Sequence, residues 1–150
     1  MKRLTSHIAL AVVALLMLGS CSKNNGDIGY WFGLWHLDSI ELNGEVDNNY
    51  NGCYYFKFQN KVFCISWVDE TTHDYIEQFA QWEASAGDKS LTVNFIDDHF
   101  SPNFGDTFPS NYMATVNDFN VLTLNNTTMI LTRVDEETAV TVTYHLTRCG

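Results

Sequence analysis

Apolar and polar residues alternate with a period of two in short runs between Trp31 and Arg148, and turn-forming residues separate these runs. In residues 53–59 and 61–68 the bulky apolar side chains fall on one face, with a turn near Asn60 between the two runs. This pattern predicts a β-hairpin that buries one face.

Six further runs follow the same pattern. The eight predicted strands are 31–42, 53–59, 61–68, 73–84, 89–96, 112–124, 127–134 and 138–148. Eight antiparallel strands joined in sequence order close into an up-and-down barrel, and closure leaves no exposed sheet edge. We therefore expect an all-β fold, an eight-stranded antiparallel barrel.

Two of these strands need comment. In 31–42, Trp35 and Leu37 are in one phase and Ile40 and Leu42 in the other, which predicts a β-bulge near Asp38-Ser39. Residues 74–86 also fit a helix capped by Asp74 and Glu77, because Ile76, Phe79 and Ala80 would share a face. The strand is favoured because its neighbours in the chain are strands.

The first twenty residues have a different pattern. Lys2 and Arg3 precede an unbroken apolar run from Ile8 to Leu18, which is too short to span a membrane and is typical of a signal peptide. The Leu18-Gly19-Ser20-Cys21 sequence that follows resembles a bacterial lipobox, so cleavage is expected before a lipid-modified Cys21. Acyl chains on Cys21 would anchor the protein to a membrane.

This organisation gives three segments: a signal peptide at 1–20, a polar tether at 21–30 and a barrel domain at 31–150. Ser22 is not the aspartate that retains many such lipoproteins at the inner membrane, so the outer membrane is expected. Asn24 and Asn25 stand where surface-displayed lipoproteins usually carry acids, which favours the periplasmic side over the cell surface.

Short motifs within the barrel domain resemble those of a known family. Gly33-Leu34-Trp35 resembles the Gly-x-Trp that opens lipocalins, and Val121-x-x-Leu124 with Met129-x-Leu131 resembles later strands of lipocalin-like lipoproteins from Bacteroidota. The resemblance implies a lipocalin-like barrel over about 31–148. It also implies that Trp35 packs at the barrel base against a basic residue of the last strand, a role that Arg148 fits.

Composition and charge narrow the range of partners. The chain has 4 Trp, 7 Tyr and 10 Phe, enough for an aromatic core. The formal net charge of −10 becomes −12 once Lys2 and Arg3 leave with the signal peptide, which argues against nucleic acid as a partner.

Placed on the barrel, the acids gather at one end. The four longer connections, Asn43–Gly52, Val68–Asp74, Ile96–Asn111 and Val134–Thr138, all lie at the end opposite the tether and contain no Lys or Arg. Their acids are Glu45, Asp47, Asp69, Glu70, Asp74, Asp97, Asp98, Asp106, Asp135, Glu136 and Glu137. We call seven of them the acidic mouth: Asp69, Glu70, Asp97, Asp98, Asp135, Glu136 and Glu137. Such a rim disfavours anionic ligands and favours cationic ones.

Other chemistry is weakly indicated. His73-Asp74 and the Asp97-Asp98-His99 run with Asp106 have metal-ligand types, but a solvated acidic loop is the favoured interpretation, and no metal or other cofactor is expected. No nucleophile lies in a recognisable catalytic motif and no glycine loop could cradle a phosphate, so no enzyme activity is expected.

Three cysteines remain besides Cys21. Cys53 and Cys64 are predicted to face outward on neighbouring strands, so a disulfide between them is permitted in an oxidising compartment, and Cys64–Cys149 is the alternative.

Two functions follow from these patterns. An eight-stranded barrel either fills its interior with its own side chains or holds one small ligand. The first hypothesis is a lipocalin-like lipoprotein that binds a small neutral or cationic apolar ligand, with binding candidates Trp67, Trp82, Phe95, Tyr144 and Arg133. Arg133 would either hold a carboxylate or, as favoured, pair with the rim acids. The second is a filled barrel whose acidic loops bind a basic envelope protein.

Overall fold

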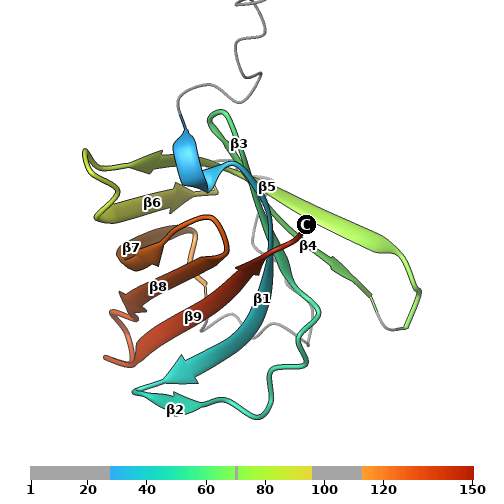
Figure 1. Ribbon diagram of the computed structural model, residues 1–150. Helices are drawn as coiled ribbons and strands as arrows, with labels where there is room; N and C mark the ends of the chain where they lie inside the picture. Colours follow the sequence, from blue (N-terminus) through green and yellow to red (C-terminus); the bar gives the residue numbers. More distant parts are fainter. Residues whose placement is uncertain (1–27, 70, 96–112) are drawn as a thin grey trace, which may run out of the picture.

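The computed structural model describes residues 28–69, 71–95 and 113–150, which form an antiparallel β-barrel (Figure 1). A 3₁₀ turn, η1 (Gly29–Trp31), precedes the strands. The described strands are β1 (Gly33–Leu42), β2 (Glu45–Val46), β3 (Tyr55–Gln59), β4 (Val62–Val68), β5 (Tyr75–Ala84), β6 (Ser90–Asn94), β7 (Val116–Leu124), β8 (Thr128–Val134) and β9 (Thr141–Arg148).

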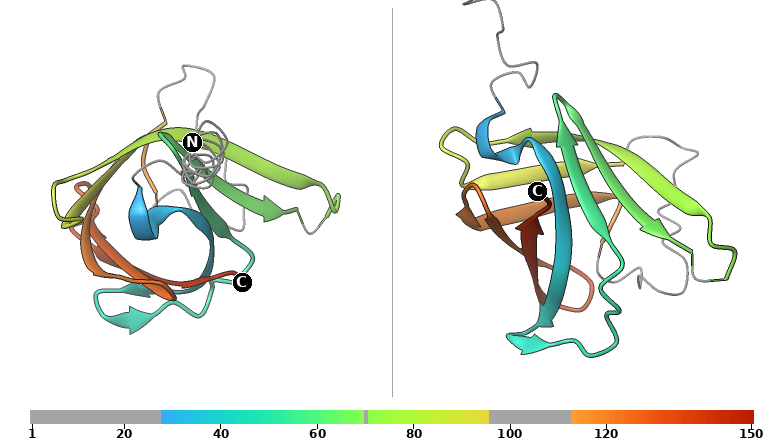
Figure 2. Two further views of the ribbon diagram at one scale, coloured as in Figure 1. Left: turned by 45° about the horizontal axis from the view of Figure 1, so that its top comes forward. Right: turned by 45° about the vertical axis from the view of Figure 1, so that its right-hand side comes forward.

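Eight of these strands close the barrel in the order β1-β3-β4-β5-β6-β7-β8-β9, and β9 pairs back with β1. The predicted all-β fold and eight-stranded barrel are therefore confirmed. The end-on view of Figure 2 shows the ring of strands with η1 lying across it. We call the end crossed by η1 the closed end and the opposite end the open end.

The two uncertain strands are settled by pairing. The register shifts between Leu37 and Ser39, which confirms the bulge and lets Leu37 and Ile40 both face inward. Residues 75–84 pair with β4 on one side and β6 on the other, so they form a strand and the helical alternative is wrong. Tertiary pairing outweighs the local capping pattern there.

The short strand β2 was not among the predicted elements. It pairs with the end of β1 through the turn residues Asn43 and Gly44, whose φ angles are 52° and 86°. Asn-Gly is the sequence that this type of two-residue hairpin turn prefers. The loop after β1 thus begins as a small hairpin outside the barrel.

No helix among the described residues is long and apolar enough to cross a membrane. The predicted signal peptide, Cys21 and most of the tether lie outside the described residues, as do Glu70, Asp97, Asp98, His99 and Asp106.

Candidate functional site

The closed end is held by Gly33, Trp35 and Arg148. The Arg148 guanidinium carbon lies 4.5 Å from the centroid of the Trp35 ring, the contact that the resemblance implied. Its Nη1 donates a hydrogen bond to the Phe32 carbonyl at 2.6 Å, and its Nη2 donates to the Tyr30 carbonyl. Arg148 therefore ties the end of the last strand to the segment that crosses the closed end.

Gly33 is required by the same contact. Its φ is +131°, and a Cβ at this position would lie 3.1 Å from Arg148 Nη1. A side chain here would therefore both strain the backbone and push the guanidinium away from Trp35.

Beside this contact, η1 is packed into an aromatic cluster. The Trp31 ring lies 5.2 Å from Phe58 and 5.5 Å from Trp82, and its Nε1 donates to Asp88 Oδ1 at 2.8 Å. Trp82 was a ligand candidate for the open end, and this placement shows that assignment to be wrong. Strand β5 runs from the open end to the closed end, and Trp82 lies near its C-terminal end, opposite Val93.

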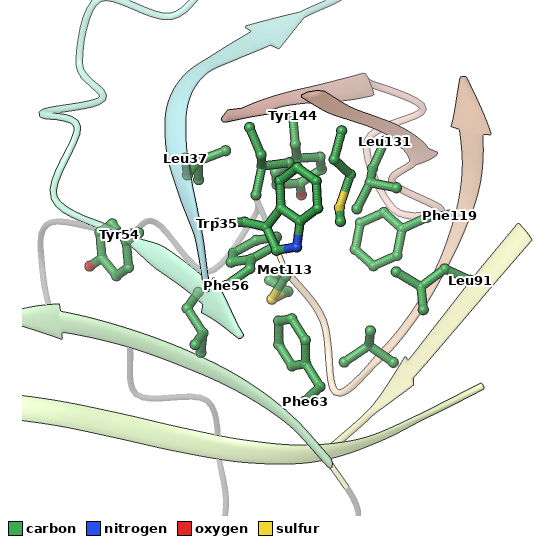
Figure 3. Packing of buried hydrophobic residues seen from close by; sticks show 14 of the residues in the cluster. Trp35, Leu37, Tyr54, Phe56, Phe63, Leu91, Met113, Phe119, Leu131 and Tyr144 are labelled. Atoms are coloured by element: carbon green, nitrogen blue, oxygen red, sulfur yellow. The ribbon is translucent and has the colours of Figure 1, made fainter. Parts of the chain in front are cut away.

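The middle of the barrel is filled by apolar side chains packed around Trp35 (Figure 3). The side chains with 1% or less of their surface exposed include Trp35, Leu37, Phe56, Phe63, Leu91, Met113, Leu131 and Tyr144. Phe56 and Phe119 each contact the Tyr144 ring, with centroids 6.2 and 5.5 Å away, so aromatic rings meet across the interior. Packing of this kind makes the middle of the barrel rigid.

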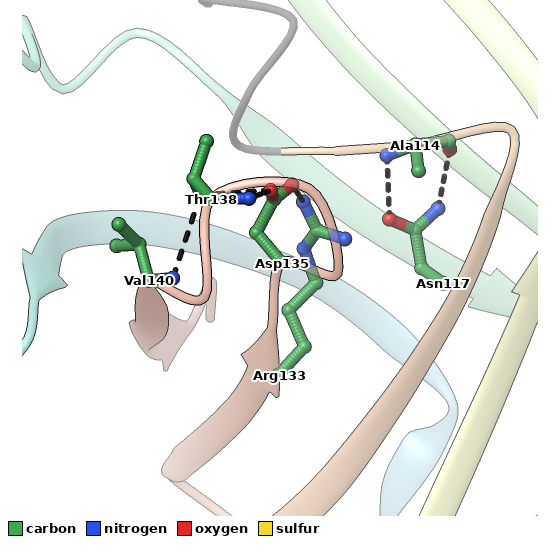
Figure 4. Close-up of polar contacts among 6 residues, drawn as sticks. All are labelled: Ala114, Asn117, Arg133, Asp135, Thr138 and Val140. Carbon is green, nitrogen blue, oxygen red and sulfur yellow. Dashed lines mark hydrogen bonds and ion pairs between the residues drawn. The ribbon is translucent and has the colours of Figure 1, made fainter.

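Arg133 lies near the open end, where it is 5% exposed and points inward as predicted. Its Nη2 contacts Asp135 Oδ2 at 3.2 Å, so it pairs with a rim acid, the favoured of the two interpretations (Figure 4). Arg133 also hydrogen-bonds Tyr144. The local positive charge is therefore largely compensated from within the chain.

Burial raises the pKa of the Tyr144 phenol to about 12, although the Arg133 charge and hydrogen bond act in the opposite direction. Tyr144 is thus a neutral hydrogen-bonding group at the boundary between the filled interior and the open end.

Two further ligand candidates lie at this level. Trp67, at the open end of β4, is 2% exposed and lies 5.3 Å from the Tyr54 ring. Phe95 follows β6, is also buried, and contacts Phe63 at 6.1 Å. The structure therefore brings Trp67, Phe95, Tyr144 and Arg133 to the open half of the interior, together with Tyr54 and Met113, which the sequence analysis did not select.

The chain that enters β7 is fixed by Asn117, a buried amide. Its Nδ2 donates to the Ala114 carbonyl at 2.6 Å and its Oδ1 accepts from the Ala114 amide at 2.8 Å (Figure 4). This paired contact holds the segment that carries Met113 into the interior.

Two acids of the predicted mouth serve to build turns. Asp69 Oδ1 accepts from the amides of Thr71 and Thr72, both at 2.8 Å. Asp135 Oδ1 accepts from the amide and hydroxyl of Thr138 at 2.9 and 2.8 Å (Figure 4).

These hydrogen bonds, before any other cause, lower the pKa of both carboxyls. Both turns are at the open end, as expected. Among the described members of the acidic mouth, Glu136 and Glu137 are the exposed acids that build no turn.

The two turns share one sequence pattern. Val68-Asp69-Glu70-Thr71-Thr72 and Val134-Asp135-Glu136-Glu137-Thr138 both read Val-Asp-Glu-x-Thr. In both, the residue after the threonine has a positive φ, 60° at His73 and 58° at Ala139. The repeat is visible in the sequence, and it indicates that the two aspartates stabilise the hairpin turns.

The disulfide that the sequence permits is not present. Cys53, Cys64 and Cys149 are not bonded to one another. In the β3–β4 hairpin Cys64 pairs with Lys57, so Cys53 lies four residues further along, about 13 Å away. Cys149 follows β9, three strands from Cys64, so both pairings are too distant for a bond. Among the described residues no group of three metal-ligating side chains forms, and His73 lies in a turn.

A hollow of about 290 Å³ opens on the outside of the closed end. It lies between η1 and the tips of the β3–β4 and β5–β6 hairpins, which flank η1 in Figure 1. Its lining includes Ile28, Trp31, Asn60, Lys61, Trp82, Glu83 and Asp88. The sequence analysis did not anticipate it, because η1 is too short to produce a helical pattern.

Comparison with protein families gives a match over most of the chain. The model of the lipocalin-like domain family matches residues 15–141. Among curated proteins, no sequence matches this chain.

Two solved bacterial structures share the fold. An uncharacterised protein from Bacteroides eggerthii is 15% identical with a TM-score of 0.59, covering 79% of this chain and 99% of that one. A lipocalin-like protein from Bacteroides uniformis is 12% identical with a TM-score of 0.59, covering 81% of this chain and 100% of that one. At these identities the comparison shows the fold alone.

Proposed function

Because the chain belongs to the lipocalin-like domain family, we propose that it is a binding protein that holds a small neutral or cationic apolar molecule at the open end of its barrel. Members of this family are in general binding or transport proteins rather than enzymes. The proposal extends that character to this chain and places the ligand beside Trp67, Phe95, Tyr144 and Arg133.

The observation that carries the proposal is the pairing of Arg133 with Asp135. The open half of the interior is aromatic, and its buried guanidinium already has a carboxylate 3.2 Å away. An anionic ligand would have to displace Asp135 and would meet the exposed Glu136 and Glu137 on entry. A neutral or cationic ligand meets neither obstacle.

Three ligands of one chain length test the charge preference: decanol, decylammonium and decanoate. We expect saturable changes in intrinsic tryptophan fluorescence with decanol and decylammonium, reduced in a Trp67→Phe variant. Lys57→Met serves as a control for a charge lost outside the interior, and Arg133→Met is expected to weaken discrimination against decanoate. Tightest binding of decanoate, or no saturable change with any of the three, would count against the proposal.

We further propose that Cys21 is lipid-modified and anchors the barrel to the outer membrane, on its periplasmic side. The support is the sequence Leu18-Gly19-Ser20-Cys21 after an apolar run. Metabolic labelling with a radioactive fatty acid should mark the wild-type chain and not a Cys21→Ala variant. Protease added to intact cells should leave the protein uncut, whereas cleavage would place it on the cell surface.

A second function, a rigid module for a basic envelope protein, is favoured by the filled interior around Trp35. Its test is capture of partners from an envelope extract by the wild type and by a Glu136→Lys/Glu137→Lys variant. Asp135 is left unchanged because it builds the turn. Partner loss in this variant, with retention in Glu83→Lys, would favour this second function; equal capture by all three proteins would oppose it.

A further inference from the structure

In the described part of the chain, the open half of the barrel wall between β1 and β4 is an irregular segment. Strand β3 begins opposite His36, so residues 47–54, which we call the wall segment, run beside β1 from there toward the open end (Figure 1). Backbone hydrogen bonds join its two ends to β1. Its middle is held by side chains: the Tyr50 hydroxyl donates to the Leu37 carbonyl at 2.6 Å, and the His36 ring contacts the Gly52 carbonyl.

The His36 ring lies between two hydrogen-bond acceptors. Its Nδ1 is 2.7 Å from Asp38 Oδ1, and its Nε2 is 2.8 Å from the Gly52 carbonyl oxygen. A carbonyl oxygen and an ionised carboxylate accept hydrogen bonds and donate none. Both contacts therefore need a proton on the ring nitrogen, and the arrangement is that of a doubly protonated imidazolium.

The surroundings of His36 favour this cation. The Thr147 hydroxyl on β9 donates to Asp38 Oδ2 at 2.5 Å, which leaves Oδ1 for His36. The other titratable groups at neighbouring positions are Cys53 in the wall segment, Tyr55 and Lys57 on β3, and His145 and Cys149 at β9. Lys57 is exposed, so water and salt screen its charge. His145 has a carboxylate of its own, since its Nε2 is 3.0 Å from Glu41 Oε1.

Loss of one ring proton must break one of the two contacts of His36. The charge-assisted bond to Asp38 is the stronger of the two, so a neutral His36 keeps its proton on Nδ1. Its Nε2 then presents a lone pair to the Gly52 carbonyl oxygen, and two acceptors repel each other at 2.8 Å. The contact that is lost is therefore the one that holds the wall segment.

We propose that His36 is a protonation-dependent clasp, which holds the wall segment against β1 when the imidazole carries two protons and releases it when the imidazole is neutral. Histidine changes its charge between about pH 5 and pH 8. Because the closed clasp binds the additional proton, acid favours closure and the clasp opens as the pH rises.

Release of the wall segment would open a route through the side of the barrel. The segment ends at Tyr54, whose ring lies 5.3 Å from Trp67 in the open half of the interior. The clasp follows from the contacts of His36, whereas control of ligand entry beside Tyr54 rests on the proposed binding function.

Hydrogen exchange of the folded chain, followed by mass spectrometry at times scaled to the intrinsic rate at each pH, tests the clasp. In the peptide that contains residues 47–54, we expect exchange to be at least about fivefold faster at pH 8.5 than at pH 5.5. The peptide that contains the turn at 135–140 is the internal control and should change little.

Two variants separate the titration of His36 from its packing. His36→Gln keeps an N–H donor that does not titrate, so exchange in residues 47–54 should change less than about twofold between the two pH values. Glu41→Gln removes the carboxylate beside His145 and should retain the acceleration of the wild type. No acceleration in the wild type, or equal acceleration in His36→Gln, would overturn the proposal.

The wild-type chain provides a second measurement that needs no variant. Imidazole nitrogen shifts from ¹H–¹⁵N spectra should show both His36 nitrogens protonated at pH 5.5 and Nδ1 alone protonated at pH 8.5. A proton on Nε2 alone at pH 8.5 would contradict the clasp. Neither measurement needs a ligand, so failure of decanol to bind would count against the proposed function and leave the clasp standing.

Discussion

At the scale of single residues, the conformation of Gly33 and the position of the Arg148 side chain depend on each other. Arg148 can lie over Trp35 and donate to two carbonyls because position 33 has no side chain. Gly33 in turn adopts a φ of +131°, which other residues avoid. The Gly-x-Trp pattern and the distant arginine are thus one feature of the sequence, separated by most of the chain.

Replacing Gly33 with alanine should lower the free energy of unfolding by about 2–3 kcal/mol, because backbone strain adds to displacement of the guanidinium. Gly44→Ala is the matched control, since Gly44 also has a positive φ but an added Cβ there meets nothing within 4 Å. We expect the control to lose about 1 kcal/mol. Urea denaturation measures both, and equal losses would contradict the role of Arg148.

At the scale of elements, the two Val-Asp-Glu-x-Thr turns show how local sequence fixes a hairpin. In each, an aspartate binds the backbone of the turn, and a residue with positive φ returns the chain to the next strand. The acids of the mouth therefore have two roles: Asp69 and Asp135 shape the loops, and the exposed Glu136 and Glu137 contribute surface charge.

Glycine should stabilise either turn at its residue of positive φ. Residues 73 and 139 have a left-handed backbone conformation, which is unfavourable for a residue with a side chain. Ala139→Gly and His73→Gly keep this conformation without its steric cost, and each is expected to raise the free energy of unfolding by about 0.5–1 kcal/mol. Ala84→Gly, within β5, should lower it instead. Stabilisation by glycine at all three positions would show that the turn geometry is not the cause.

The turn aspartates should also make stability depend on pH in acid. The pKa of Asp69 and of Asp135 is lower in the folded chain, so their contribution is complete above the unfolded pKa, about 4, and is lost as the pH falls through the folded value. Asp69→Asn/Asp135→Asn keeps an acceptor oxygen and should flatten the decline of the urea midpoint between pH 5 and pH 2.

Glu136→Gln/Glu137→Gln makes the same change in net charge and serves as the control. If it flattens the decline as much as the aspartate variant does, the turn hydrogen bonds are not responsible.

Most elements could be predicted because alternation marks each strand, and the strand count with Gly33-x-Trp35 pointed to closure. The 74–86 segment could not be settled, because its capping pattern is local while its pairing with β4 and β6 is not. The alternation correctly places Trp82 on the inner face of the barrel, but its assignment to the open end is wrong. The direction of β5, from the open end to the closed end, would have corrected this error. The Cys53–Cys64 disulfide does not form because of the strand register: a tight turn after Gln59 places Lys57, not Cys53, opposite Cys64.

At the scale of the whole molecule, the reactivity of the Cys64 thiol can be used to detect opening of the barrel wall. It faces outward on β4, yet it is 2% exposed, and burial followed by the nearby Glu77 raises the pKa of its thiol to about 12. Neighbouring side chains on β3 and β5 therefore cover the outer surface of the sheet at this point.

A thiol reagent at pH 8 should modify Cys53 and Cys149, which are partly exposed, well before Cys64. Cys64 is expected to react at the rate of unfolding, at least a hundredfold slower than Cys149, because both its exposure and its thiolate fraction are low. Mass spectrometry of the three peptides over time measures this. Early labelling of Cys64 would mean that β4 and β5 separate without global unfolding.

The pairing of β1 with β9 sets the order in which the chain can be completed. Arg148 reaches the carbonyl of Phe32 across 116 positions. Because a chain is synthesised from its N-terminus, β1 lacks its partner β9 until residues 141–148 have been added. Until then β1 is an open edge, able to pair with other chains, so exposure to chaperones and proteases is built into the biogenesis of this barrel.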